Sequence, residues 1–313
     1  MLKMWYEVNE AWSEASLVWL SSLVMNCKVC EVIELVGWCE VVAGREEWVE
    51  EYIYRCAEII GGRFKFEVRV YEAKEYGIEL CGRCIPRESV GIAISRIEHY
   101  NEMLREEEME AINKGRHEIL SSYRDKDYYI HCDIDCVFTE WFDAGVLLGE
   151  LEELTEDNGR CIVGVSEYEE IESVLAETHS EGFMERLGGV YLNCGFICFH
   201  RIKRIDIDRL IEFLKGRDSY CLEQDYINNE YEKREMSVNW NMTFRSGVHL
   251  PYMIHYYGEN KPFLAKSEGV CDRSYEYFGI WFRYVEGIKW ILSKEFYSRC
   301  LSRYRDYLVW EGR

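Results

Sequence analysis

The chain has only three prolines in 313 residues. Rigid turns are therefore scarce, and glycine, asparagine and aspartate must end most helices and strands. The sequence also lacks a long low-complexity tract, an internal repeat and a linker-like stretch. Because hydrophobic residues make up 48% and charged residues 30%, the composition is that of a folded globular protein and excludes general disorder.

An excess of positive charge is missing as well. The 37 basic residues stand against 58 acidic ones, so the formal net charge is −21 at pH 7. Such a field repels phosphate backbones and anionic lipid, and we expect no nucleic-acid partner. A small anionic ligand needs a cation or a local basic cluster that reverses the field where it binds.

The sequence also shows no targeting segment and no membrane-spanning segment. The first sixteen residues, MLKMWYEVNEAWSEAS, lack the basic stretch and apolar run of a signal peptide. The longest apolar stretches, such as residues 16–25, are interrupted and too short to span a bilayer. We therefore expect a cytoplasmic protein without stable membrane insertion.

Fourteen cysteines do not fit a secreted disulfide scaffold in so long a chain. We expect most of them, including Cys132, Cys194 and Cys198, to pack as small apolar side chains. Two Cys-x-x-Cys pairs, 27/30 and 81/84, leave a zinc site or a local disulfide as alternatives.

Strand and helix patterns alternate along the chain. The predicted strands cover residues 3–8, 29–36, 64–71, 127–134 and 189–200. The predicted helices cover residues 10–25, 46–60, 205–215, 222–233 and a tail at 275–310, and residues 95–123 are expected to form a solvated pair of helices with a break at Gly115. This order predicts an α/β fold with a mostly parallel central sheet flanked by helices and followed by a C-terminal helix that packs against it.

The most informative segment is YYIHCDIDCVF at 128–138, a strand pattern that ends in Asp-x-Asp. Open α/β sheets bind ligands at the carboxyl ends of their strands, and strand alternation predicts Asp133 and Asp135 on one side. Carboxylates this close repel each other unless a cation lies between them, and oxygen ligands favour Mg²⁺ or Mn²⁺. An Asp-x-Asp pair can also occur by chance or cap the turn after a strand. If it is a site, phosphatases, nucleotidyltransferases and glycosyltransferases all present carboxylates in this way.

Four further motifs follow the acid pair in order: YLNCGF at 191–196, EQDYIN at 223–228, WN at 240–241 and HYYGENKPF at 255–263. The series resembles glycosyltransferase family 8, the group containing glycogenin and the bacterial lipooligosaccharide galactosyltransferases. The resemblance covers about residues 127–263 and implies the GT-A fold. We expect a single GT-A domain at 1–265, with a nucleotide-binding half at about 1–140 and an acceptor and catalytic half at about 141–265. A helical extension would follow at 266–313.

The resemblance implies a metal site of Asp133, Asp135 and His255 that holds Mn²⁺ (or Mg²⁺) against the diphosphate of a nucleotide-sugar donor. Asp133 would also lie near the donor ribose. Lys261 would touch the diphosphate, and Gly258 would let the backbone approach it closely. The metal would thus reverse the acidic field at one place.

Other positions of the resemblance face the donor sugar. Gln224 and Asp225 match positions near the reacting carbon and are the catalytic candidates, and Asn193 would line the same pocket. An arginine before the metal strand should bind the donor; Arg116 is slightly preferred to Arg96 because it lies closer to the acid pair in sequence. Either arginine could instead pair with a surface glutamate.

Four positions depart from the family pattern: Leu192, Cys194, Glu223 and Phe263. The resemblance nonetheless implies metal-dependent transfer of a hexose from a UDP-linked donor to a hydroxyl of a glycan, protein or small-molecule acceptor, with retention. A nucleotidyltransferase is disfavoured because residues 6–13 contain no glycine- and lysine-rich loop. A non-catalytic relative that binds nucleotide or glycan stays open.

Aromatic side chains supply candidates for stacking on a sugar ring. Among the 46 aromatic residues implied by 10 Trp, 23 Tyr and 13 Phe, the motif neighbours Trp240, Tyr256 and Tyr257 are the ones expected to do so.

Overall fold

The computed structural model describes residues 1–74, 76, 87–113, 127–157, 159–167, 185, 187–215, 221–243, 250–264 and 274–310. Its chain forms two compact units. Unit 1 comprises Met1–Lys3, Glu72–His131 and Leu148–Met236, and unit 2 comprises Met4–Tyr71, Cys132–Leu147 and Ser237–Arg313. These units are defined by contacts within the chain and do not test which residues bind nucleotide and which bind acceptor. The division into a nucleotide-binding half at about 1–140 and an acceptor and catalytic half at about 141–265 stays a prediction.

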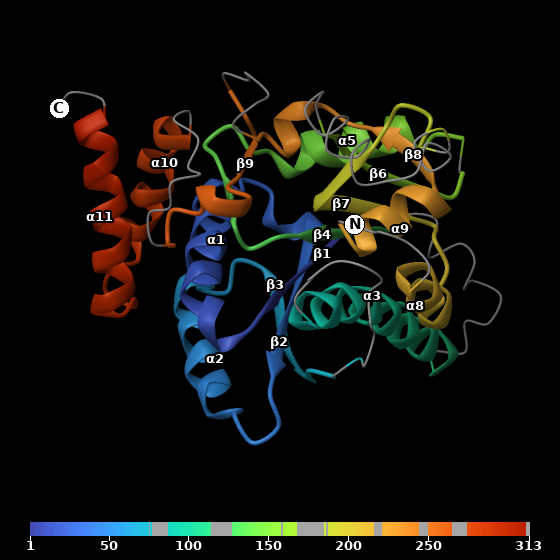
Figure 1. Ribbon diagram of the computed structural model, residues 1–313, viewed down its shortest axis with the longest axis horizontal. Coiled ribbons are helices and arrows are strands. Elements are labelled where there is room, and N and C mark those ends of the chain that lie inside the picture. The colour runs from blue at the N-terminus through green and yellow to red at the C-terminus, as the bar shows by residue number, and fades with distance from the viewer. Residues whose placement is uncertain are drawn as a thin grey trace. The chain divides into compact units, whose positions relative to one another are not determined.

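In the described part of the chain, the main sheet has seven strands in the order β3-β2-β1-β4-β7-β6-β8. Its strands are β1 (Leu2–Val8), β2 (Ile33–Val41), β3 (Lys65–Glu72), β4 (Tyr128–Cys132), β6 (Cys161–Ser166), β7 (Leu192–His200) and β8 (Glu232–Glu235). Strand β6 pairs antiparallel with β7 and parallel with β8. Helices flank the strands in Figure 1, so the predicted α/β fold with a mostly parallel sheet is confirmed.

Unit 2 is built around α1 (Ser13–Asn26), which follows β1 through a short 3-10 turn, η1 (Glu10–Trp12). Ten consecutive residues of α1 are buried, from Ala15 to Val24. A helix that is apolar on every side must be covered on every side. It contacts α2 (Glu47–Ile60), β5 (Cys136–Phe138) and α10 (Ser274–Gly287), and Figure 1 shows α1 and α2 side by side.

A two-stranded antiparallel ribbon in unit 2 joins β5 to β9 (Met253–His255). Its register places Cys136 opposite His255. The ribbon brings the end of the Asp-x-Asp motif next to a histidine more than 100 residues later in the chain, as their numbers show.

Unit 1 places α3 (Arg87–Asn113) against α8 (Ile207–Lys215) and α9 (Glu223–Glu230). Helix α9 also contacts β7. Helix α5 (Ala144–Leu154) begins in unit 2 and ends in unit 1. The motif EQDYIN is therefore the start of a helix that lies on β7, the strand carrying YLNCGF.

Several predicted boundaries are wrong. Strand β4 ends at Cys132, and the acid pair lies in a turn in which the Cys136 amide donates to the Asp133 carbonyl at 3.3 Å. Residues 30–32 form a 3-10 turn, so β2 begins at Ile33. The predicted helix at 222–233 ends at Glu230, since the next four residues pair with β6 as β8.

The tail forms two helices rather than one, α10 and α11 (Lys294–Trp310), which pack side by side. Trp281 and Tyr284 are buried in this pair, which confirms its packing role. Helix α3 begins eight residues earlier than predicted, and positions 114–123 of that prediction lie outside the described residues.

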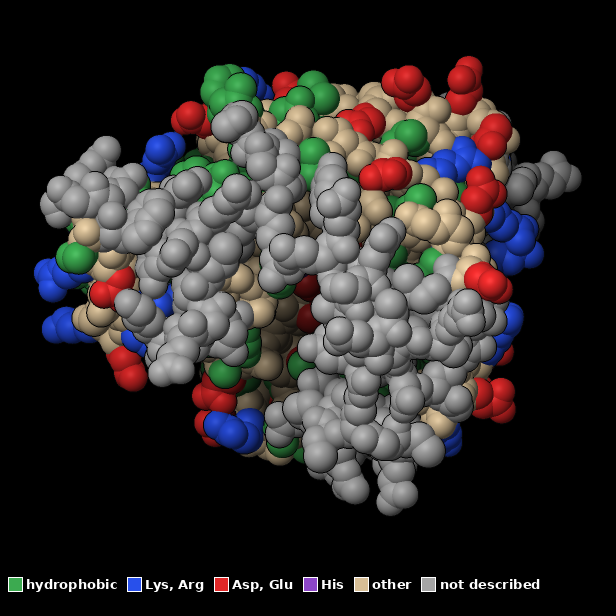
Figure 2. Space-filling view, turned by 45° about the horizontal axis from the view of Figure 1, so that its top comes forward, with side chains coloured by type: hydrophobic (Ala, Val, Ile, Leu, Met, Phe, Trp, Pro, Cys, Tyr) green, Lys and Arg blue, Asp and Glu red, His purple; other side chains and the backbone are tan. Residues whose placement is uncertain are grey.

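No helix in the described part of the chain is long and apolar enough to cross a bilayer. On one face of the molecule, acidic and basic side chains are interspersed wherever the structure describes it (Figure 2). Cys27, Cys30, Cys132, Cys194 and Cys198 are buried free thiols, so the predicted packing role of the last three is confirmed. Cys81 and Cys84 lie outside the described residues.

Candidate active site

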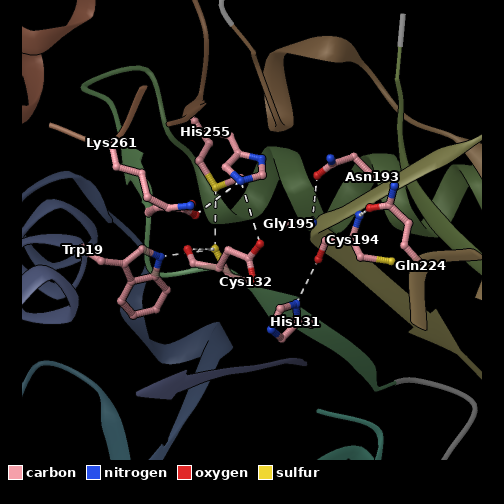
Figure 3. Close-up of polar contacts among 12 residues, drawn as sticks. Trp19, His131, Cys132, Asn193, Cys194, Gly195, Gln224, His255 and Lys261 are labelled. Carbon is pink, nitrogen blue, oxygen red and sulfur yellow. Dashed lines mark hydrogen bonds and ion pairs between the residues drawn. The ribbon is translucent and has the colours of Figure 1, made fainter. Parts of the chain in front are cut away.

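The Asp-x-Asp turn of unit 2 gathers three of the predicted site residues around Asp135. Its Oδ2 lies 2.9 Å from Lys261 Nζ, and its Oδ1 lies 3.3 Å from His255 Nε2. Asp133 Oδ2 is 3.8 Å from the same imidazole nitrogen. In Figure 3 the side chains of His255 and Lys261 point toward one another. The structure thus brings together the residues for which the resemblance implied metal and diphosphate binding.

Local backbone contacts hold this turn in place. The Tyr256 amide donates to the Asp135 carbonyl at 2.9 Å, and the His255 amide donates to the Met242 carbonyl at the same distance. Beneath the turn, Cys132 Sγ accepts a hydrogen bond from Trp19 Nε1 at 3.2 Å. The carboxylates are therefore presented by a fixed backbone rather than by a free loop.

Burial and charge oppose each other at Asp135. Its side chain is only 8% exposed, and burial alone would raise its pKa. The charges of Lys261 and His255 outweigh burial and hold the pKa of Asp135 below its usual range. The same contacts raise the pKa of Lys261 and of His255 against the effect of their own burial. Asp135 is an anion that its neighbours keep ionised.

The donor set fits a divalent cation. Within the described residues, Asp135 Oδ1 and His255 Nδ1 are buried atoms without a hydrogen-bond partner. Asp135 Oδ1 has the ion pair with His255 but no hydrogen bond to a described residue, and a cation would satisfy such a buried carboxylate oxygen. Asp133 is the more accessible member, with 26% of its side chain exposed.

A fourth group, Cys136, was not predicted. Its sulfur and the ligand atoms of Asp135 and His255 all lie within 4.8 Å of one another. Burial raises the pKa of Cys136 well above its usual value, so it is a neutral thiol. Because Mg²⁺ and Mn²⁺ prefer oxygen, Cys136 is a neighbour of the hard ligands rather than a replacement for them.

Gly258 begins the short turn η4 (Gly258–Asn260), and Lys261 directly follows it. Gly258 has φ = +61°, a left-handed conformation that favours glycine, and a Cβ there would meet nothing within 4 Å. Its backbone therefore faces open space. Lys261 Nζ lies 5.4 Å from the centre of the Trp12 ring, and the Trp12 and Phe263 rings form a T-shaped pair with their centres 5.1 Å apart.

Unit 1 holds the predicted sugar-facing residues. Asp225 is fully buried, and both its oxygens are used: Oδ1 accepts from the Tyr191 hydroxyl at 2.6 Å and Oδ2 from the Cys221 amide at 3.0 Å. The carboxylate raises the pKa of Tyr191 further above the value that burial gives it. Asp225 thus fixes the start of α9 and the strand beside it.

Gln224 is 8% exposed, and its Oε1 accepts from the Cys194 amide at 2.7 Å. Its Nε2 donates to Glu167 Oε1 at 3.4 Å, and Asn193 donates to the same oxygen. Asn193 Oδ1 accepts from the Gly195 amide at 2.8 Å. Figure 3 shows Gln224 beside Asn193 and Cys194.

Glu167 was missed by the sequence analysis. It directly follows β6, and its amide donates to the Tyr191 carbonyl at 2.8 Å. The signal that could have found it is an acidic residue at the end of a buried strand, the same signal that singled out Asp133.

The arginine candidates have different outcomes. Arg96, on α3, forms an ion pair with Glu223, and both side chains are nearly buried. This is the glutamate that departs from the family pattern. Arg116 lies outside the described residues.

Two of the three stacking candidates are wrong. Trp240 and Tyr256 are completely buried, and the Tyr256 hydroxyl donates to the Tyr277 carbonyl at 2.7 Å. A ring packed on both faces cannot stack on a sugar. Tyr257 is half-buried, with its ring 5.8 Å from that of His255.

We compared the chain with known protein families, curated proteins and solved structures. No protein-family model matches the sequence, and no curated protein matches it. Among solved structures, the galactosyltransferase LgtC in complex with donor and acceptor sugar analogs is similar over 95% of this chain and 99% of its own, with a TM-score of 0.59 and 15% identity. The chain has the GT-A fold.

Two further structures share the GT-A fold with this chain. An active-site glutamine-to-glutamate mutant of LgtC matches with a TM-score of 0.59 and 14% identity over 95% of this chain and 99% of that one. The apo structure of WbbM, a bifunctional glycosyltransferase, matches with a TM-score of 0.60 and 15% identity over 96% of this chain. This chain spans about half of WbbM, 51% of its length. The GT-A fold implied by the motif series is thus confirmed.

Proposed function

We propose that this protein is a metal-dependent glycosyltransferase that moves a hexose from a nucleotide-diphosphate sugar, UDP-linked, to an acceptor hydroxyl with retention. One observation carries the proposal. Two carboxylates, an imidazole and an ammonium group meet at the Asp-x-Asp turn of a chain with the GT-A fold.

The charges at the turn explain why a metal is needed. When His255 is neutral, as a metal ligand must be, Asp133 and Asp135 contribute two negative charges and Lys261 one positive charge, which leaves the turn acidic in an acidic protein. Asp133, Asp135 and His255 would hold Mn²⁺ or Mg²⁺. When bound, the divalent cation stabilises the negative charge that develops on a departing diphosphate. Lys261 would contact that diphosphate, and the open backbone of Gly258 would let it approach.

The residues of unit 1 would bind the donor sugar. Gln224 and Asn193 carry amide groups that can bind sugar hydroxyls, and Glu167 orients both of them. Asp225 has both oxygens engaged, so it positions α9 rather than attacking the sugar. With no free basic nucleophile at these motif positions, retention would follow from attack on the same face that the diphosphate leaves.

Thermal unfolding with UDP, GDP and CDP, each with and without Mn²⁺, tests the proposal. We expect UDP to raise the melting temperature by several degrees, about 1.5 °C for each kcal/mol of binding free energy at this chain length, and only when Mn²⁺ is present. Asp135→Asn should abolish the shift. The matched control, Glu140→Gln, removes an exposed acid of the same unit and should leave the shift intact. A nucleotide shift that does not depend on metal would contradict the proposal.

One observation favours a second candidate function, a non-catalytic relative that binds nucleotide or glycan. Glu223 of the EQD motif is bound by Arg96, an arrangement that stabilises structure without requiring chemistry. Release of nucleoside diphosphate separates the two functions: a binding protein shows the metal-dependent melting shift but releases no UDP from UDP-sugars.

A further inference from the structure

The positively charged ammonium of Lys261 lies directly beside the Asp135 carboxylate, where a metal ion would also bind. Its ammonium lies 2.9 Å from Asp135 Oδ2, and its side chain is only 18% exposed. The ammonium also lies over the Trp12 ring, 5.4 Å from its centre, so both an aromatic face and a carboxylate stabilise it. All three residues belong to unit 2.

A lysine so placed competes with a metal. Asp135 is nearly buried, and each of its oxygens already faces one partner, Lys261 at Oδ2 and His255 at Oδ1. A divalent cation that binds this carboxylate meets the positive charge of the ammonium at short range, where burial weakens solvent screening. Metal binding is therefore opposed as long as the ammonium stays on Asp135.

We propose that Lys261 acts as a stand-in cation. It neutralises Asp135 in the metal-free protein, and it transfers its ammonium from Asp135 to the diphosphate of the donor when a divalent cation takes its place. The inference rests on the proposed function, since it assumes the metal and the nucleotide named there. It adds that one side chain couples the two binding events.

The charge balance gives the coupling its sign. With His255 neutral, as an imidazole that binds a metal must be, two aspartates and one lysine sum to −1; a bound divalent cation changes the sum to +1, which attracts a diphosphate. Lys261 lowers the affinity for metal when no nucleotide is present and raises the affinity for nucleotide when metal is bound. Opposite effects of one residue on two ligands are not expected of a residue that only maintains the fold.

Direct binding of Mn²⁺, measured from the electron paramagnetic resonance signal of the free ion, tests the first effect. We expect Lys261→Met to bind Mn²⁺ about tenfold more tightly than the unaltered protein in the absence of nucleotide, a typical coupling between linked sites. Calorimetric titration in saturating Mn²⁺ should show UDP binding weakened by about tenfold. Lys289→Met, which removes an exposed lysine paired with Glu286, is the matched control and should change neither affinity.

A second measurement needs no variant. Acylation of lysines in the native protein, followed by mass spectrometry, reports how accessible each ammonium is. Labelling of Lys261 should be slow without metal, increase by about fivefold or more on addition of Mn²⁺ and decrease again when UDP is added. Labelling of Lys289 should stay constant. If Mn²⁺ leaves the labelling of Lys261 unchanged, the stand-in role is wrong.

The outcomes separate the inference from the proposed function. Equal or weaker Mn²⁺ binding by Lys261→Met, together with metal-dependent UDP binding by the unaltered protein, overturns the inference and leaves the function standing. Absence of Mn²⁺ binding in both proteins, with UDP as well as without it, overturns both. If only the variant binds Mn²⁺ tightly without nucleotide, the ammonium of Lys261 by itself prevents metal binding in the unaltered protein, which supports the stand-in role.

Discussion

Asn228 shows how a single side chain positions the motif residues of unit 1. Its Oδ1 accepts from the Leu192 amide at 2.7 Å, and its Nδ2 donates to the Leu192 carbonyl at 2.8 Å and to the Gln224 carbonyl at 2.9 Å. The side chain is 1% exposed. The amide thus pairs with the backbone of β7 as a neighbouring strand would, and it ties Gln224 to that strand.

Asn228→Ala should destabilise the protein by about 2–4 kcal/mol, because it leaves buried backbone groups of Leu192 without partners. Urea denaturation followed by circular dichroism measures the change. Asn229→Ala, one position later and half-buried, removes a contact to the adjacent Glu230 and should cost less than about 1 kcal/mol. Equal costs for the two variants would contradict the role given to Asn228.

At the same scale, the motif residues of the metal site could be predicted from the sequence and several of their neighbours could not. Asp135, His255 and Lys261 are recognisable because their chemistry is unusual and their order is fixed. The burial of Trp240 could not be predicted, since an aromatic residue beside a motif fits a binding platform and a core equally well. Cys136 meets His255 only through the pairing of β5 with β9, and three-residue strands give no periodic signal.

Among the elements, β1 and β2 are packed so closely that one glycine is required. A Cβ on Gly37 of β2 would lie 2.6 Å from the Tyr6 hydroxyl. That hydroxyl is 2.9 Å from the Tyr52 hydroxyl, which is itself 2.9 Å from Ser16 Oγ. The glycine leaves room for a buried hydroxyl chain that links β1, α1 and α2.

Gly37→Ala should therefore cost about 1–3 kcal/mol, since Tyr6 cannot move without breaking this chain. The matched variant is Gly149→Ala in α5, where a Cβ meets nothing within 4 Å. It should be neutral or stabilise the protein by up to about 1 kcal/mol, because alanine favours a helix. Thermal unfolding of the two variants gives the comparison, and a stable Gly37→Ala protein would disprove the packing argument.

Most long elements could be predicted and the short ones could not. Helices α1 and α2 follow from the spacing of their apolar residues, to within a few positions. Strand β4 ends before Asp133 because the chain turns there to reach β9, a long-range pairing that local pattern does not reveal. Strand β8 reads EKRE, which has no apolar face, and it forms only because β6 offers an edge.

Over the whole molecule, many acidic hydroxyl and thiol groups are buried in their neutral form. Burial raises the pKa of Cys56, Cys221 and Cys300 from 9.0 to about 12. It also raises the pKa of Tyr6 and Tyr256 well above 10.0. The folded protein thus keeps protons that the unfolded chain releases between about pH 9 and pH 10.

This difference predicts alkaline instability with a definite sign. The stability that these groups contribute is complete below about pH 9 and is lost as the pH rises toward 12, because the unfolded state then binds fewer protons than the folded one. Each group can contribute up to about 1.4 kcal/mol per pH unit in that range. The urea midpoint, measured with reductant present, should be lower at pH 10.5 than at pH 8, whereas an equal or higher midpoint would contradict the assigned burial.

The net charge of −21 bears on function at this scale too. It opposes binding of any anion unless the local sign is reversed, and the turn of Asp133, Asp135 and His255 is where a bound cation would do so. We therefore expect this acidic protein to bind and cleave a nucleotide sugar only when a divalent metal ion is bound.

Release of UDP from UDP-sugars, followed by chromatography with Mn²⁺ and with chelator, tests that claim most directly. We expect UDP release with Mn²⁺ for at least one common UDP-hexose, even without an acceptor, because water can take the place of the acceptor hydroxyl. Chelator should stop the release, and Asp135→Asn should lower it by at least about a hundredfold. UDP release that continues unchanged in chelator, or in the variant, would contradict the account.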